Sequence, residues 1–163
     1  MSQTKNKIVL YSILMFSICA ILVAYFIQYV LGHQPCNLCL IERIPYIFSI
    51  IIILIFLFTQ KFEKIILISL SLIFFSATLL SLYHVGIEQG FISESLVCDL
   101  NSKNNELSKE DILNQLKKMP ISCKDVTFKI FGLSLATFNI FISLMLSAIT
   151  MKLFLTYEKN KSI

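Results

Sequence analysis

Residues 34–43, QPCNLCLIER, place a Cys-x-x-Cys pair and an arginine between two long apolar runs. Two thiols at this spacing can close a small disulfide, or can contribute to a metal site if two further ligands arrive. A helix that begins at Cys39 would carry Arg43 one turn further along on the same face. The guanidinium and the positive end of that helix would favour a thiolate at Cys39, so the motif predicts a reactive dithiol.

The apolar runs around this motif indicate the class of protein. The chain has 163 residues, of which 56% are hydrophobic and 15% are charged. Runs near the length of a membrane-spanning helix occupy about residues 8–30, 40–59, 65–85 and 131–154. We therefore expect an all-α membrane protein, a four-transmembrane-helix bundle in which residues 1–163 form a single membrane domain. The first run is long and no small-residue cleavage site follows it, which predicts an uncleaved anchor.

The placement of the lysines predicts the orientation of the spans. The net charge of +4 is modest and lies mostly between the apolar runs, so it does not indicate nucleic-acid binding. The lysines of the amino-terminal segment, of the short connection at residues 60–64 and of the carboxyl-terminal tail all fall on one side. The positive-inside rule makes that side cytoplasmic. In a Gram-negative cell, the loops at about 31–39 and 86–130 would then face the periplasm and the spans would lie in the inner (plasma) membrane.

The sequence does not decide at which residue the second span begins. If the segment 38–41 extends the apolar run that begins at Ile44, Cys39 and Arg43 lie in the first turns of the helix and near the membrane surface. If the helix begins at Pro45, the dithiol lies in a loop. Both alternatives keep the two thiols at the outer end of the second span.

The long periplasmic loop is expected to contain a short amphipathic helix. Ser108 is a good N-cap, the residues that follow place apolar side chains on one face, and Pro120 ends the pattern. The helix at about 108–119 would lie flat on the outer leaflet or pack on the bundle, and the pattern favours neither. It would separate Cys98 from Cys123 by a structured insert.

Four of the five cysteines lie outside the membrane in this topology. An even set of thiols in an oxidising compartment is more often two disulfides than four free groups. A disulfide that closes over two residues stabilises the fold little, so the Cys-x-x-Cys pair suits exchange better than support. Four sulfurs could also bind zinc, but such sites favour reducing compartments, and we expect no metal here. Cys19, alone in the first span, is expected to be a small packing residue.

Three segments of the sequence, together with the order of the cysteines, form a recognisable pattern. They are PCNLCLIERIPY at residues 35–46, YHVGIE at 83–88 and FGLSLATFN at 131–139. Together they resemble the bacterial disulfide bond formation protein B family over most of the chain, and the Cys-x-x-Cys followed by Glu-Arg is the specific part. The chain lacks tryptophan, whereas family members often carry one where Phe138 stands. This departure concerns interfacial packing more than chemistry.

The resemblance implies a membrane oxidoreductase. It would reoxidise a periplasmic DsbA-like thiol oxidase of thioredoxin fold by disulfide exchange. It would pass the electrons to ubiquinone or menaquinone in the membrane. The partners implied are this oxidase, the lipid and the quinone pool, with no nucleic acid.

The resemblance also implies a role for each candidate site residue. Cys98 would accept attack from the partner, with Cys123 as its disulfide partner. Cys36 would exchange with this second-loop pair, and its own disulfide partner, Cys39, would face the quinone. Arg43 would stabilise the Cys39 thiolate and donate hydrogen bonds to a quinone oxygen. His84 would contribute to the quinone site from the facing span, although a histidine near a membrane end is often only a solvated interfacial residue.

Two other functions fit part of the pattern. A structural membrane subunit would use the same cysteines as inert disulfides. Quinone reductases of the vitamin K epoxide reductase type also combine four spans with a Cys-x-x-Cys and loop cysteines. In that family the Cys-x-x-Cys follows the loop pair, whereas here it comes first, which disfavours this alternative.

Overall fold

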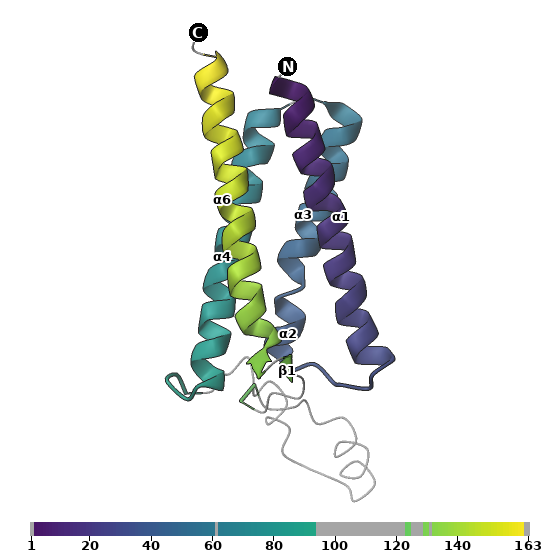
Figure 1. Ribbon diagram of the computed structural model, residues 1–163, viewed down its shortest axis with the longest axis vertical. Helices are drawn as coiled ribbons and strands as arrows, with labels where there is room; N and C mark the ends of the chain where they lie inside the picture. Colours follow the sequence, from purple (N-terminus) through teal and green to yellow (C-terminus); the bar gives the residue numbers. More distant parts are fainter. Residues whose placement is uncertain (1, 61, 94–122, 125–128, 131, 162–163) are drawn as a thin grey trace, which may run out of the picture.

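The computed structural model describes residues 2–60, 62–93, 123–124, 129–130 and 132–161. The helices stand side by side, and both termini lie at the same end of the bundle (Figure 1). Cys98 and the helix expected at about 108–119 lie outside the described residues. The elements in chain order are α1 (Ser2–Tyr29), α2 (Asn37–Ile41), α3 (Ile44–Thr59), α4 (Glu63–Glu88), β1 (Lys129–Ile130), β2 (Leu133–Ser134) and α6 (Leu135–Lys161).

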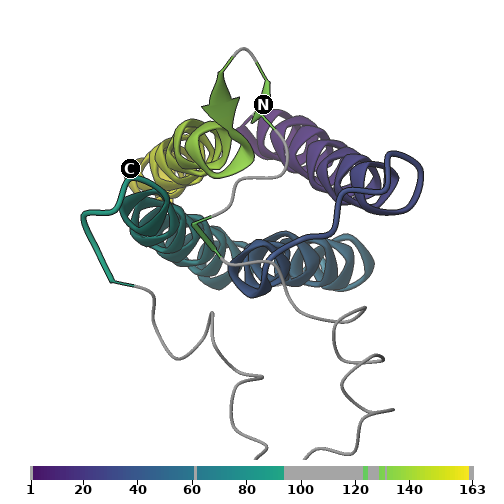
Figure 2. The same ribbon diagram turned by 90° about the horizontal axis from the view of Figure 1, so that it is seen from below.

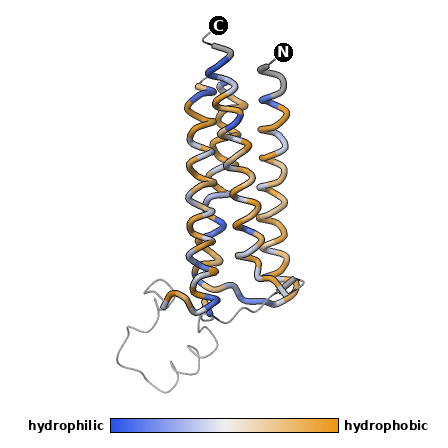
Figure 3. The backbone as a smooth tube through the Cα atoms, turned by 60° about the vertical axis from the view of Figure 1, so that its left-hand side comes forward, coloured by the Kyte–Doolittle hydropathy of each residue, from blue (hydrophilic) through white to orange (hydrophobic). Residues whose placement is uncertain are grey.

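The described residues contain four helical segments long and apolar enough to cross a membrane. They are Asn6–Tyr29, Asn37–Thr59, Glu63–Glu88 and Leu135–Lys159. Apolar residues follow these helices along most of their length (Figure 3), and many large hydrophobic side chains are exposed on the outside of the bundle. A helix satisfies its own backbone groups, so such a surface suits lipid. The expected all-α, four-span architecture is confirmed.

Viewed along the bundle, the long helices form a ring in which α1 neighbours α3, α3 neighbours α4 and α4 neighbours α6 (Figure 2). Side chains such as Leu67 and Phe74 of α4 are fully buried in the centre. Small hydroxyl side chains join α4 to α6: Ser147 Oγ donates to the Ser71 carbonyl at 3.1 Å, and Thr78 Oγ1 donates to Ser143 Oγ at 3.0 Å. Small residues let helices approach closely in lipid, where polar side chains also add interhelical hydrogen bonds.

The second span begins with a short helix and a break. Cys36 is the N-cap of α2, and its Sγ accepts a hydrogen bond from the backbone N–H of Cys39 at 3.2 Å. The helix ends at Ile41, and α3 starts at Ile44 with Pro45 in its first turn. Proline has no N–H to donate to the carbonyl four residues earlier, so the helical ladder is interrupted here. Cys39 therefore lies in a helical turn that leads into the main helix.

The third and fourth spans differ from the expected bounds in ways that shape the site. Helix α4 runs to Glu88 rather than ending near residue 85, so His84 and Glu88 lie on the same helix one turn apart. The fourth helix begins at Leu135 rather than near 131, because β1 and β2 form an antiparallel pair with Lys129 opposite Ser134. Gly132 turns this hairpin at a φ of 81°, a conformation that suits glycine.

Candidate functional site

A cavity of about 380 Å³ lies among the helices next to the Cys-x-x-Cys pair. Helices α1, α2, α3, α4 and α6 all contribute to its wall, which is mainly apolar. Its volume falls within the range of about 300–1,000 Å³ typical of small-molecule sites. The polar or reactive residues in the wall are Cys19, Gln28, His33, Gln34, Cys36, Cys39, Glu42, Arg43, Tyr46, His84, Glu88, Cys123 and Asn139.

Cys36 and Cys39 are both free thiols at this cavity. Cys36 is 6% exposed, and its Sγ lies 3.5 Å from Nε2 of His84. The hydrogen bond from the Cys39 side chain is the largest cause that lowers the pKa of Cys36; burial opposes it and His84 reinforces it, and the resulting pKa is about 5. Because the thiolate is the nucleophile in thiol chemistry, Cys36 is prepared to react at neutral pH.

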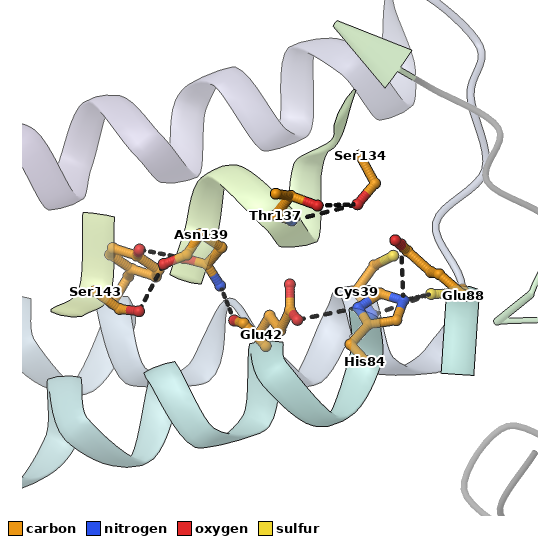
Figure 4. A network of polar contacts seen from close by, with 11 residues as sticks. Cys39, Glu42, His84, Glu88, Ser134, Thr137, Asn139 and Ser143 are labelled. Atoms are coloured by element: carbon orange, nitrogen blue, oxygen red, sulfur yellow. Dashed lines mark hydrogen bonds and ion pairs between the residues drawn. The ribbon is translucent and has the colours of Figure 1, made fainter. Parts of the chain in front are cut away.

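His84 lies at the centre of a buried polar group. Its side chain is 3% exposed, its Nδ1 lies 3.0 Å from Oε1 of Glu42, and its Nε2 lies 3.6 Å from Oε1 of Glu88. Figure 4 shows the imidazole with Glu42 on one side and Glu88 on the other. The contact at Nδ1 orients the ring so that Nε2 faces the Cys36 thiol. His84 is thus a partner of the dithiol rather than a solvated residue at a membrane end.

Arg43 faces α1. Its Nη1 donates to Oε1 of Gln28 at 2.7 Å, and its guanidinium carbon lies 5.1 Å from the centre of the Tyr25 ring. Helix α2 ends at Ile41, but Glu42 and Arg43 keep right-handed helical dihedral angles that lead into α3. Arg43 and Cys39 line the same cavity. The thiolate predicted at Cys39 beside Arg43 stays a prediction.

Cys123, a cysteine of the long loop, lies at the same cavity. It is disulfide-bonded and 2% exposed, and it packs in a buried cluster with Cys36, Leu38 and Ile87. Since Cys98 lies outside the described residues, the pairing of Cys98 with Cys123 stays a prediction. A disulfide sulfur of the long loop and a free thiol of the Cys-x-x-Cys pair are therefore neighbours in one cluster.

Several residues of the site escaped the sequence analysis. Glu42 appeared there only within the motif, and Glu88 only within a segment of the resemblance. The spacing of His84 and Glu88, four residues apart on a helix, was a usable signal for their contact. Further along the cavity, the Tyr46 hydroxyl donates to Oδ1 of Asn139, and Nδ2 of Asn139 donates to Ser81 Oγ at 2.7 Å. These two hydrogen bonds join α3, α6 and α4, and sequence spacing does not predict them.

The fold and the site together define a class: a multi-pass membrane protein that carries a dithiol and a disulfide-bonded cysteine at one cavity. Comparison with known proteins gives the family. The family model described as "Disulfide bond formation protein DsbB" matches residues 6–153. The chain belongs to this family, and it is accordingly a membrane protein of disulfide bond formation.

A relative from Rickettsia prowazekii (strain Madrid E), described as "Uncharacterized protein RP370", is similar over nearly the whole chain. The two sequences are 31% identical over 160 residues, which is 97% of this chain and 92% of the relative. The similarity thus extends over all four spans.

Proposed function

We propose that the protein is a quinone-linked thiol-disulfide oxidoreductase that reoxidises a periplasmic DsbA-like dithiol oxidase. One observation carries the proposal: the buried cluster that holds both the free thiol of Cys36 and the disulfide-bonded Cys123 against one cavity. Disulfide exchange needs a thiolate within reach of a disulfide sulfur, and this cluster supplies both. Family membership supports the same reaction class.

In the exchange steps, two electrons pass from the partner's dithiol to the two cysteine pairs in turn. The partner's dithiol reduces the Cys98–Cys123 disulfide through a mixed disulfide at Cys98. The reduced loop pair then attacks the Cys36–Cys39 disulfide at Cys36, so that two electrons pass to this pair and the loop disulfide closes again. Free thiols at Cys36 and Cys39 with a disulfide at Cys123 correspond to the state after this transfer.

His84 and Glu42 act on the proton of Cys36 in this proposal. Nε2 of His84, at 3.5 Å, stabilises the Cys36 thiolate, and Glu42 holds the ring by its Nδ1 at 3.0 Å. The contacts of His84 support a role at the thiol, and its contribution to the quinone site, implied by the resemblance, stays a prediction. We regard His84 and Glu42 as groups that hold a proton near Cys36 while electrons leave the dithiol.

The cavity fits a quinone. Its wall is mainly apolar, which suits a quinone ring and the start of its tail, and its few polar groups include a cation and a thiol. Arg43, held by Gln28 and Tyr25, would donate to a carbonyl oxygen, and Cys39 would face the ring. Ubiquinone or menaquinone bound here supplies the two-electron acceptor.

We also propose an orientation. The lysine pattern places both termini in the cytoplasm, and the two termini lie together at the end of the bundle away from α2 and β1 (Figure 1). The four cysteines of the two loops would then face the periplasm, within a single membrane domain in the bacterial inner membrane.

The test of the function is a turnover assay with purified protein in detergent. A reduced thioredoxin-fold oxidase and a short-chain quinone are the substrates, and the absorbance of the quinone is followed. We expect turnover by the unchanged protein, loss of turnover in Cys39→Ser, and nearly unchanged turnover in the matched control Cys19→Ser. Normal turnover in Cys39→Ser would contradict the mechanism, and inert structural disulfides would give no turnover in any form.

A further inference from the structure

Three potential metal ligands meet at one end of the cavity. The side chains of Cys36, Cys39 and His84 offer two sulfurs and one ring nitrogen that all lie within 4.8 Å of one another. We propose that the reduced dithiol and His84 form a site for a thiophilic divalent cation of the Zn²⁺ type, which excludes the Cys36–Cys39 disulfide while it is bound. The inference rests on the proposed function in one respect, namely that the dithiol becomes reduced during turnover.

The spacing of the ligand atoms matches tetrahedral coordination. Bond lengths of about 2.3 Å for Zn–S and 2.0–2.1 Å for Zn–N place sulfur and nitrogen ligands about 3.6 Å apart around a tetrahedral ion. The observed separation of Cys36 Sγ and His84 Nε2 is 3.5 Å. This pair is thus already at the distance that a zinc ion requires, and the Cys39 sulfur lies within 4.8 Å of both atoms.

The surroundings of His84 are those of a metal-bound histidine. A histidine that binds a metal through one ring nitrogen commonly donates its other N–H to a carboxylate, which fixes the ring. Glu42 fills this role, because its Oε1 lies 3.0 Å from Nδ1 and leaves Nε2 directed at the sulfurs. Glu88 Oε1 lies 3.6 Å from the same Nε2, and a water or another oxygen ligand would complete the tetrahedron. The side chains of His84 and Glu88 are only 3% and 7% exposed, so a cation there would neutralise buried negative charge.

This site differs from the zinc site that the sequence disfavoured. Four cysteines in an oxidising compartment would have to stay reduced together, whereas here two thiols and a histidine suffice and only the dithiol state binds. Both sulfurs bind the cation as thiolates, so binding releases any proton that they still hold and transfers no electron. Closing the Cys36–Cys39 disulfide requires both sulfurs, so the cation must leave before electrons can pass on. Excess cation would therefore hold the dithiol reduced and slow turnover.

The test uses Co²⁺ as a spectroscopic probe of the full-length protein in detergent, without oxygen, quinone or partner. We expect the reduced protein to bind one Co²⁺, with a thiolate-to-cobalt charge-transfer band and the visible bands of a tetrahedral ion, and we expect Zn²⁺ to displace it. The same protein with the Cys36–Cys39 disulfide closed should show neither band. This comparison needs no variant, so a folding defect cannot produce it.

Variants then assign the ligands. Cys39→Ser and His84→Gln should weaken binding by more than about 100-fold, and Glu42→Gln by roughly 10- to 100-fold, as is usual for residues that orient a ligand. The matched control is Cys19→Ser, which removes a thiol of the cavity wall that is outside the ligand group, and it should bind the cation as the unchanged protein does. Circular dichroism spectra that match the unchanged protein would show that each variant is folded.

The outcomes separate this inference from the proposed function. A thiolate-to-cobalt band in the reduced protein alone supports the site even if quinone turnover is never observed. Absence of the band in the reduced protein, or its persistence in the oxidised protein or in folded Cys39→Ser, overturns the site even if turnover is normal.

Discussion

The contact between His84 and Cys36 leads to a quantitative prediction about thiol reactivity. His84→Gln removes the imidazole and its charge from Cys36, while the hydrogen bond from Cys39, which is the larger cause, remains. A hydrogen bond to a charged group contributes about 1.5–3 kcal/mol, which corresponds to about 1–2 pKa units. Loss of a group that favours the thiolate raises the pKa. The pKa of Cys36 should therefore rise from about 5 to roughly 6–7.

The size of the effect depends on the pH of the measurement. At pH 6, a thiol with a pKa near 5 is about 90% thiolate, whereas a pKa of about 6–7 leaves roughly 10–50%. The rate of alkylation at Cys36 should thus fall about 2- to 10-fold at pH 6 and should be nearly unchanged above about pH 8.5, where both proteins are ionised.

The assay is alkylation of the reduced protein by iodoacetamide across a pH series, with the modified cysteine located by fragment-ion mass spectrometry. Rates are normalised to the plateau at high pH, so that a change in access to the buried thiol does not count as a change in pKa. The control is His33→Gln, which replaces the other histidine of the chain, a residue of the same cavity wall that is not among the causes of the lowered pKa of Cys36. A midpoint for Cys36 in His84→Gln that equals or lies below that of the unchanged protein would refute the reasoning.

Two further predictions concern the quinone and the topology. Arg43→Ala should lower kcat/KM for the quinone by about 10- to 100-fold, the effect of losing one charge-assisted hydrogen bond, while exchange with the partner persists; an unchanged value in the quinone assay would remove Arg43 from the site. Alkaline phosphatase should be inactive when fused after Ile163 and active when fused after Gly90, because the proposed orientation puts the first point in the cytoplasm and the second in the periplasm. An active fusion after Ile163 would reverse the orientation.

The spans were predictable because the bilayer imposes a local rule. About 20 apolar residues in a helix are needed to cross the hydrocarbon, and this requirement is visible along the chain without knowledge of any contact. The ends of the spans were less predictable. Helix α4 continues past Gly86 to Glu88, although glycine disfavours a helix interior, because tertiary packing overrides such a local preference. The hairpin of residues 129–134 was not expected, since two strands of two residues each leave almost no pattern.

For the Cys-x-x-Cys pair, too, the sequence predicted one property and left others to the structure. Its reactivity was predicted from spacing, and the predicted cause was Arg43, which lies two positions after the end of α2 and donates to Gln28. Pro45 was visible in the sequence as a residue that disturbs a helix, but the contacts of Arg43 with Gln28 and Tyr25 of α1 were not.

By itself the sequence determined that four apolar helices span a membrane and that a dithiol stands at the start of the second. It also indicated the family through the order of the cysteines. Only the tertiary structure decided that His84, 48 residues after Cys36, faces that thiol with Glu42 behind it. The physical reason is that periodicity and composition report which residues leave water, whereas the partner of a buried polar group depends on which helices pack together and at what rotation.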